Sequence, residues 1–131
     1  MNAPSIDIKD ILLRHPELRL VFGENLHVGR EPSSPNNTVT IFDTSGSPPQ
    51  LTYQRGENYE YPAIQIRVRN VSYADGFSLA KRIQGILHTI SGIQINGSFY
   101  TLVYSTGDPF LLDWDANNRS RCIINFELQR R

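Results

Sequence analysis

The sequence predicts an α+β fold in which one mixed or mostly antiparallel sheet packs against a long helix and an N-terminal helix. Residues 63–69 alternate apolar and polar side chains, as a half-buried strand does, and residues 121–129 alternate again. Between them, apolar side chains recur at helical spacing, which places the long helix at about 72–90. With the shorter strand-like runs, this order favours a sheet of about four strands. At 131 residues, the chain is expected to form one domain, 1–131.

The N-terminal segment predicts a helix that ends before residue 16. Ser5 is placed to cap this helix. Three apolar residues then fall on one side of it: Ile8, Ile11 and Leu12. Because the residue before Pro16 avoids the helical region, the helix ends there, and residues 17–22 favour a further turn.

Two strand-like runs and two connections follow. Residues 26–29 predict a short strand, and residues 38–43 alternate in the manner of a second strand. Residues 31–37 between them form a turn-rich connection. Residues 44–61, which are largely polar and contain several glycines and prolines, predict the longest unstructured stretch. A loop of this length inside a compact domain is often functional, disordered or ordered by a partner, and we expect a partner to order it.

The rest of the chain predicts the main helix and the last strands. Ser72 and Asp75 form a variant of the capping box, and Gly92 stops the helix. Residues 99–104 predict a central strand, and residues 121–129 predict a long last strand. The inward face of that last strand carries four residues: Cys122, Ile124, Phe126 and Leu128.

The composition indicates a folded, modestly polar protein with little affinity for nucleic acid. Hydrophobic residues make up 39% of the chain and charged residues 20%, and the formal net charge is +0. Proteins that wrap DNA normally carry a basic excess, so we expect DNA to pass nearby without being held. Cys122 is the only cysteine, so no disulfide forms within the chain.

Neither a targeting signal nor a membrane span is predicted. Residues 1–10 lack the positive flank and apolar core of a signal peptide. No apolar run approaches the ~18 residues that a membrane-spanning helix needs. We therefore expect a cytoplasmic location, or a place in a particle assembled there, and no membrane partner.

Several short motifs suggest chemistry, but each lacks residues that the chemistry requires. Asp113, Asp115 and Asn117 match three ligand positions of an EF-hand loop, yet Ile124 stands where the bidentate glutamate is needed. The S-x-x-K pair at 78–81 lacks the supporting motifs of acylating enzymes. No histidine has a ligand partner at suitable spacing. We expect no catalytic residue, metal or cofactor, and no enzymatic activity.

Three blocks of sequence stand out in a fixed order. They are 24–32 (ENLHVGREP) with 38–49 (TVTIFDTSGSPP); 61–69 (YPAIQIRVR) running into the helix at 73–88; and 99–100 with 108–119 (DPFLLDWDANNR), closing on 124–131 (INFELQRR). In order and spacing, these blocks resemble the phage minor capsid family that groups with tail terminators. The chain departs from the family at one point: Leu112, Asp113 and Trp114 stand where members often have a glycine just before the acidic hairpin tip.

The resemblance implies a structural virion protein of long-tailed phages. It implies a ring, commonly a hexamer, on the last layer of tail-tube subunits, where the ring stops tube growth and presents a docking surface for the filled head. The implied partners are further copies of the chain, the tail-tube protein and a head-completion or connector protein. Genomic DNA would pass through the ring without specific binding.

Two sets of residues are candidates for these contacts. The first is expected to meet the tube or a neighbouring subunit, with the arginines on the outward face of their strand: Thr44, Gly46, Gln54, Arg55, Glu57, Arg67 and Arg69. The second is an acidic tip, a candidate for lining the channel, where negative charge would repel phosphate: Asp108, Asp113 and Asp115. The alternative is an ordinary solvated hairpin tip, which is polar in any soluble protein.

Two other interpretations remain open. The first is a different ring-forming neck component, such as a head-completion or connector protein of similar size. The second is an unrelated soluble enzyme or binding domain, which would stay monomeric and show a ligand-dependent shift in melting temperature.

Overall fold

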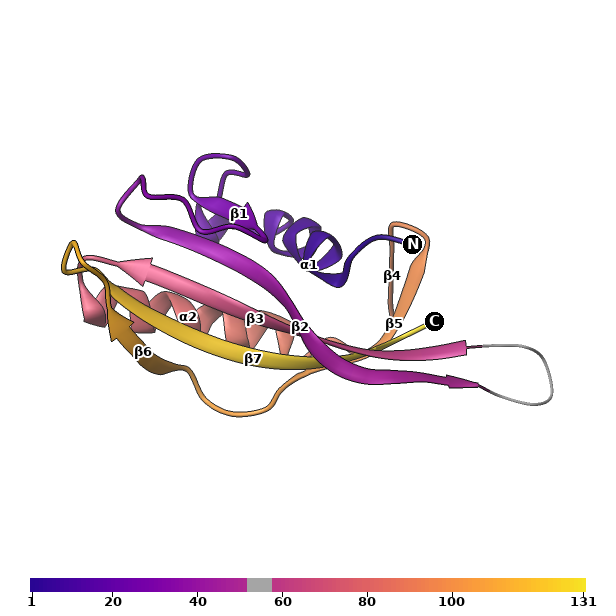
Figure 1. Ribbon diagram of the computed structural model, residues 1–131. Helices are drawn as coiled ribbons and strands as arrows, with labels where there is room; N and C mark the ends of the chain where they lie inside the picture. The colour runs from indigo at the N-terminus through magenta and orange to yellow at the C-terminus, as the bar shows by residue number, and fades with distance from the viewer. Residues whose placement is uncertain (52–57) are drawn as a thin grey trace.

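The alternating runs predicted as strands pair into one curled sheet in the computed structural model, which describes residues 1–51 and 58–131 (Figure 1). Its seven strands are β1 (Leu26–Val28), β2 (Thr38–Leu51), β3 (Asn58–Asn70), β4 (Ile93–Ile95), β5 (Ser98–Ser105), β6 (Phe110–Trp114) and β7 (Ser120–Arg130). The helices are α1 (Pro4–Leu13), α2 (Tyr73–Leu87) and a short 3-10 helix, η1 (Pro16–Leu18). The predicted α+β class is confirmed.

The sheet is mixed, with one parallel pair. Its strand order is β1-β2-β3-β7-β5-β4; β1 runs parallel to β2, and the other neighbouring strands are antiparallel. Strand β7 is long enough to pair with two strands on the same side, β6 along its first half and β5 along its second half. The predicted count of about four strands is wrong, because β4 is too short to show alternation and β6 is apolar at nearly every position.

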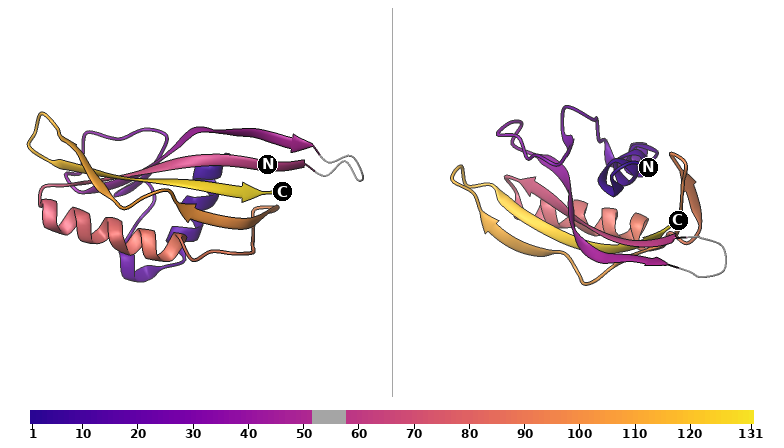
Figure 2. Two further views of the ribbon diagram at one scale, coloured as in Figure 1. Left: turned by 90° about the horizontal axis from the view of Figure 1, so that it is seen from below. Right: turned by 45° about the vertical axis from the view of Figure 1, so that its right-hand side comes forward.

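Both α-helices pack against one face of the sheet, here called the inner face (Figure 2). Ile64, Ile66 and Val68 of β3 point into the core between the sheet and the helices, as the alternation predicted. Helix α1 contributes Ile8 to the same core, and α2 contributes Ile83. Each fully buried side chain of this size stabilises the fold by about 1.5–3 kcal/mol. None of the helices in residues 1–51 and 58–131 lies on the opposite, outer face of the sheet.

Helix α1 is capped by a strand residue and not by Ser5. Ser5 lies within the first turn, and the carboxylate of Asp43 on β2 accepts hydrogen bonds from its backbone N–H at 2.9 Å and from its hydroxyl at 2.6 Å. An acidic side chain at this end also interacts favourably with the helix dipole. The prediction that Ser5 caps this helix is therefore wrong. The carboxylate that accepts the N–H group at the start of the helix comes from a distant part of the chain.

Helix α2 is shorter than predicted at 72–90. Ser72 does cap it, with its side chain accepting a hydrogen bond from the Asp75 N–H at 3.3 Å. The helix ends at Leu87, and the Nδ1 of the next residue, His88, accepts a hydrogen bond from the N–H of Ser105 at 2.9 Å. Ile90 then leaves the helix, and its carbonyl accepts a hydrogen bond from the N–H of Val103 on β5.

The predicted unstructured stretch at 44–61 is wrong for the residues that the structure describes. Residues 44–51 extend β2, and residues 58–61 begin β3. Together they form a two-stranded arm that projects beyond the rest of the sheet (Figure 1). Prolines and glycines are tolerated here because β2 is an edge strand beyond its short pairing with β1, whose last pair is Val28 with Ile41.

A buried polar network joins α1 to the far end of the sheet. Asp7 is 0% exposed, and its carboxylate accepts hydrogen bonds from the Tyr100 hydroxyl at 2.5 Å and from Asn96 at 2.8 Å. Arg130 lies 3.5 Å from the same carboxylate and donates to Glu60 at 2.7 Å. Burial, followed by the hydrogen bond to Asp7, raises the pKa of Tyr100, so its hydroxyl stays protonated as the donor. We call these five residues the Asp7 network.

Candidate functional site

The outer face of the sheet is the surface on which the predicted interface residues lie. Arg69 points to this face, but it is 2% exposed, so the predicted exposure is wrong. Its guanidinium donates to the carbonyl oxygens of Pro35 at 2.7 Å and Asn36 at 3.2 Å, and to Glu31 at 3.3 Å. The connection at 31–37 covers the arginine, which the strand alternation could not show.

Two further arginines fasten the same connection. Arg119 donates to the carbonyl oxygen of Ser33 at 2.7 Å, and Arg121 lies 3.4 Å from Glu31. Planar guanidinium groups suit such contacts because they donate several hydrogen bonds in a fixed geometry. We call Arg69, Arg119 and Arg121, with Glu31, the Arg clamp. The clamp holds 31–37 against one end of the outer face.

Arg67 belongs to the edge of this region. Its guanidinium lies 3.8 Å from Glu31 and 5.0 Å from the centre of the Phe42 ring, and its side chain is 23% exposed. Its Nε is buried without a hydrogen-bond partner, as is one carboxylate oxygen of Glu31. The predicted contact between Arg67 and another subunit stays a prediction, but most of this side chain is already used within the chain.

Gly46 has a structural reason to be glycine. It lies at an irregularity in the pairing of β2 with β3, between the residues Thr44 and Ser47. A Cβ atom at Gly46 would lie 2.1 Å from the carbonyl oxygen of Tyr61, so no side chain fits there. Thr44 is exposed beside it and remains a candidate for contact with a partner. The other predicted interface residues lie outside the described residues: Gln54, Arg55 and Glu57.

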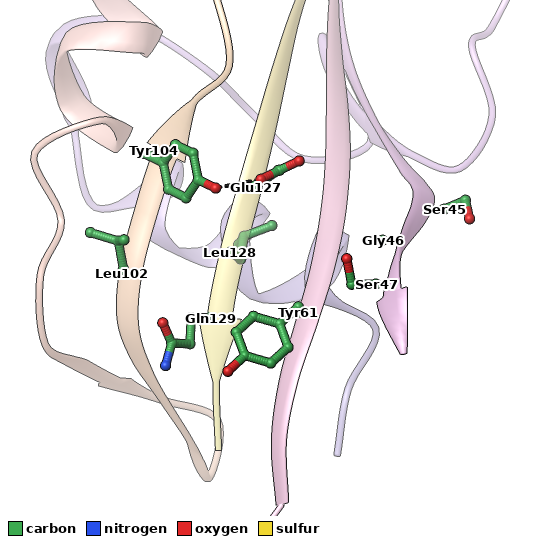
Figure 3. Close-up of a pocket in the computed structure, with 9 residues that line it drawn as sticks. All are labelled: Ser45, Gly46, Ser47, Tyr61, Leu102, Tyr104, Glu127, Leu128 and Gln129. Atoms are coloured by element: carbon green, nitrogen blue, oxygen red, sulfur yellow. Dashed lines mark hydrogen bonds between the residues drawn. The ribbon is translucent and has the colours of Figure 1, made fainter. Parts of the chain in front are cut away.

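A hollow of about 300 Å³ lies on the outer face next to this irregularity (Figure 3). Tyr61 of β3 borders it on one side, and Leu102 and Tyr104 of β5 border it on the other. The Tyr104 hydroxyl donates a hydrogen bond to Glu127, which raises the pKa of Tyr104. The hollow therefore combines apolar and aromatic walls with polar groups, which are the two serines of β2, Gln129 and the carboxylate of Glu127.

The predicted acidic tip is not one cluster. Asp113 and Asp115 lie near each other at the β6–β7 turn, whereas Asp108 lies before the other end of β6. The side chain of Asp108 is 76% exposed and lies 3.0 Å from Lys81 of α2. The hydrogen bond from Lys81 lowers the pKa of Asp108.

The other two aspartates are also paired with cations. Asp113 accepts two hydrogen bonds from Arg121, at 2.6 and 2.5 Å, which lower its pKa. Arg119 donates to Asp115 at 2.8 Å. The pKa of Asp115 is lowered as well, because hydrogen bonds, including those from the N–H groups of Arg119 and Asn117, outweigh its desolvation. Every member of the predicted tip therefore has a positive partner, which weakens its negative field.

The EF-hand-like residues Asp113, Asp115 and Asn117 lie at the β6–β7 turn, where Asp115 stabilises the turn. The carboxylate of Asp115 accepts the N–H groups of Asn117 and Arg119, each at 2.9 Å, and thereby closes the β6–β7 turn. Asn118 adopts a positive φ of 57° in this turn. No group of three potential metal ligands occurs within residues 1–51 and 58–131.

The surface feature that sequence reasoning missed is β6. Four of its five residues are large, apolar and exposed: Phe110, Leu111, Leu112 and Trp114. The run FLLDW was visible in the sequence, but without alternation it predicted neither a strand nor its exposure. A contiguous exposed apolar patch on a soluble protein commonly marks a binding surface.

A comparison with known protein families identifies the kind of protein to which this surface belongs. Residues 12–131 match the family described as "Bacteriophage tail terminator protein". The chain belongs to this family. It is therefore a structural, tail-associated virion protein, as the resemblance in the sequence implied.

The fold has relatives among solved structures. A chain from the "Virion of native gene transfer agent (GTA) particle" is similar with a TM-score of 0.68 at 11% sequence identity. The similarity covers 98% of this chain and 94% of that chain. At this identity the likeness shows a shared fold. No curated protein matches the sequence. None of the helices in the described part of the chain has the length and apolar character to cross a membrane.

Proposed function

We propose that this tail terminator protein forms a ring, in keeping with a hexamer, at the head-proximal end of the tail tube. The ring ends tube polymerisation and offers the docking surface for the head. The observation that carries this proposal is the family match across residues 12–131. The proposed partners are further copies of the chain, the tail-tube protein and a head-completion or connector protein. The proposed role needs no bond-breaking step, and we propose that the protein is not an enzyme.

The architecture supports assembly into a closed ring. A ring requires two different surfaces on each copy that fit one another and close by rotation. The sheet has an unpaired strand edge at β6 and another along β2 beyond Ile41, as far as the described residues show. The arm of β2 and β3 also projects away from the helices, where a neighbouring subunit could contact it (Figure 2).

Purified tail-tube protein provides the test. The chain is added to polymerising tubes, and tube length and tube ends are measured by electron microscopy. We expect shorter tubes with a ring at one end, because a terminator covers the surface to which the next tube layer would bind. A head-completion or connector ring would bind the connector and leave tube growth unchanged. That second outcome would replace the terminator proposal with the alternative neck component.

Channel lining by the acidic residues stays a prediction. Reversing the charge of Asp113 or Asp115 would also remove a partner from the Arg clamp, so such variants confuse channel charge with stability. Asp108 is the better probe, because its side chain is 76% exposed and lies outside the clamp. If Asp108 lines the channel, Asp108→Lys should slow DNA ejection while ring formation stays intact, with only a small fall in melting temperature because the broken pair with Lys81 is exposed.

A further inference from the structure

Strand β6 places large apolar side chains in solvent at an edge of the sheet. Phe110 is 49% exposed, Leu112 43% and Trp114 50%. Within the described residues, β6 pairs with β7 alone, so its other edge has no strand partner. An unpaired edge with apolar side chains is a template for pairing with another chain.

The strand carries little of the protection usual on exposed edges. Residues 110–114 contain neither lysine nor proline, which commonly keep edge strands apart from other chains. The one charged residue, Asp113, is neutralised by Arg121. The irregularity between Leu111 and Asp113 leaves Leu112 exposed. The edge therefore presents apolar side chains and free backbone groups together.

The other end of the same sheet has a second open edge. Strand β1 pairs only with residues 39–41 of β2. From Phe42 onward, the described part of β2 has a strand partner, β3, on one side only. The side chains of Thr44, Ser45 and Ser47 are small and exposed, so another strand can approach the backbone there.

We propose that β6 of one copy pairs with β2 of the next copy, at residues 42–47, and that this is the lateral contact of the ring. The inference rests on the proposed function and names its subunit interface. Strand β6 runs antiparallel to β2 within one sheet, because β2, β3, β7 and β6 alternate in direction. A sheet that continues into the next copy with the same strand directions therefore pairs β6 antiparallel with the neighbour's β2.

The occupant of the β6 edge is a second copy because the chain supplies both halves of the contact. Head-to-tail rings need two different surfaces on one chain, and the open edges of β6 and of β2 at 42–47 lie on opposite sides of the central pair β3 and β7. A tube subunit bound at β6 would leave the β2 edge of every copy unpaired. Pairing β6 with β2 satisfies both edges with one repeated contact.

The side chains fit this arrangement. Phe110 lies opposite Ile123, which lies opposite Arg67, so Phe110 points to the outer face. The hollow of about 300 Å³ is on the outer face and borders the β2 edge through residues 45–47. Leu102 and Tyr61 give that hollow apolar walls for an aromatic side chain from the neighbour.

The first test uses Trp114, the single tryptophan of the chain, as a reporter. Sedimentation velocity and tryptophan emission are measured over a dilution series. We expect association at high concentration and a blue shift of the emission as Trp114 leaves water. Leu112→Glu should weaken association at least about tenfold, because a charge would then be desolvated between two paired strands. The matched control is Val21→Glu, since Val21 is 49% exposed outside both edges, and it should associate as the wild type does.

The second test fixes the pairing by disulfide cross-linking. Leu112→Cys combined with Ser45→Cys should give a ladder of covalent multimers under oxidation, because paired strands bring facing Cβ atoms within disulfide range. Leu112→Cys combined with Val21→Cys is the control and should give no ladder. The native Cys122 does not interfere, since it is buried and its burial raises the pKa of its thiol.

The outcomes separate this interface from the proposed function. The β6–β2 contact would be overturned if Leu112→Glu associated as strongly as the wild type. It would also be overturned if the Leu112–Val21 cysteine pair gave as many covalent multimers as the Leu112–Ser45 pair. A wild-type protein that stays monomeric at every concentration would overturn it as well. In each case the tube-length assay on the wild type still decides whether the chain terminates tubes. Loss of association in Leu112→Glu with an unchanged melting temperature, together with the Leu112–Ser45 ladder, establishes the contact.

Discussion

The Asp7 network and the Arg clamp are both built from arginines and carboxylates, yet they hold different things. In the Asp7 network, side chains from α1, β5 and β7 meet one another, and Asp7 is 0% exposed. In the Arg clamp, the guanidinium groups of Arg69 and Arg119 also hold backbone carbonyls of one connection, such as those of Ser33 and Pro35. The Asp7 network therefore joins elements of the core, whereas the Arg clamp attaches a surface segment to the outer face of the sheet.

The difference predicts two kinds of failure. Removing a member of the Asp7 network leaves a buried charge or donor without a partner inside the core, so the cost falls on global unfolding. Removing a member of the Arg clamp releases residues 31–37, while the sheet and both α-helices keep their packing. Local opening of this kind is seen as faster amide hydrogen exchange in the released segment.

The largest effect is expected from Asp7→Asn. It removes the negative charge that faces Arg130, 3.5 Å away, and leaves that cation less compensated in a buried site. We expect a loss of roughly 3–5 kcal/mol in the free energy of unfolding, measured by urea denaturation. The matched control is Asp10→Asn, because Asp10 also binds Asn96 but is partly exposed and should cost less than about 1 kcal/mol. Equal losses in the two variants would contradict the central role of Asp7.

A smaller and local effect is expected from Arg69→Met, which keeps much of the apolar stem. It removes the hydrogen bonds to Pro35, Asn36 and Glu31. We expect a loss of roughly 1.5–3 kcal/mol, the usual range for hydrogen bonds with a charged group, together with faster exchange at 31–37. Arg67→Met is the control, since Arg67 makes no hydrogen bond to the backbone of 31–37 in the structure. Exchange that rises equally across the whole sheet would show that the clamp is part of the core.

The same contrast explains what the sequence could and could not predict. Alternation in β3 and β7 and the helical spacing in α2 report burial against a neighbouring layer, so the inner face followed from residue order. Alternation also placed Arg67 and Arg69 on the opposite face. It could not show that 31–37 folds back over Arg69, because that contact joins residues more than 30 positions apart.

The candidate surfaces were harder to predict for a related reason. Gly46 looked like a loop residue, but it is needed where a β2 irregularity passes close to the Tyr61 carbonyl oxygen. The aspartates were predicted as one acidic tip, because their cationic partners are not visible in the sequence: Arg121 and Arg119 meet Asp113 and Asp115 where β6 and β7 pair, and Lys81 of α2 meets Asp108. The apolar run of β6 could have indicated an exposed patch, but apolar residues without alternation are equally typical of a buried strand.

Tyr100→Phe is expected to have a more modest effect within the Asp7 network. It keeps the ring and removes the hydroxyl that donates to Asp7 at 2.5 Å and accepts from Arg130 at 3.1 Å. Because Asp7 still has Asn96 as a donor, we expect a loss of about 0.5–1.5 kcal/mol in urea denaturation. Tyr104→Phe is the control, since Tyr104 bonds Glu127 on the exposed outer face. If Tyr104→Phe lowers the free energy of unfolding as much as Tyr100→Phe does, the hydroxyl of Tyr100 has no special role in the Asp7 network.

The smallest effect is expected from Asp113, a partner of the Arg clamp through Arg121, and it depends on pH. The hydrogen bonds from Arg121 lower the pKa of Asp113 in the folded chain. A carboxyl with a lowered folded pKa stabilises the fold above its unfolded pKa, about 3.9 for aspartate, and this contribution is lost as pH falls through the folded value. Asp113→Asn should therefore speed amide hydrogen exchange at 31–37 at pH 7 and make that exchange less sensitive to acid below about pH 4.

The matched control is Asp108→Asn. It removes a carboxyl that lies outside the clamp and whose pKa is lowered by Lys81, so exchange at 31–37 should match the wild type at every pH. If both variants change that segment alike, Asp113 does not act by orienting Arg121 toward Glu31.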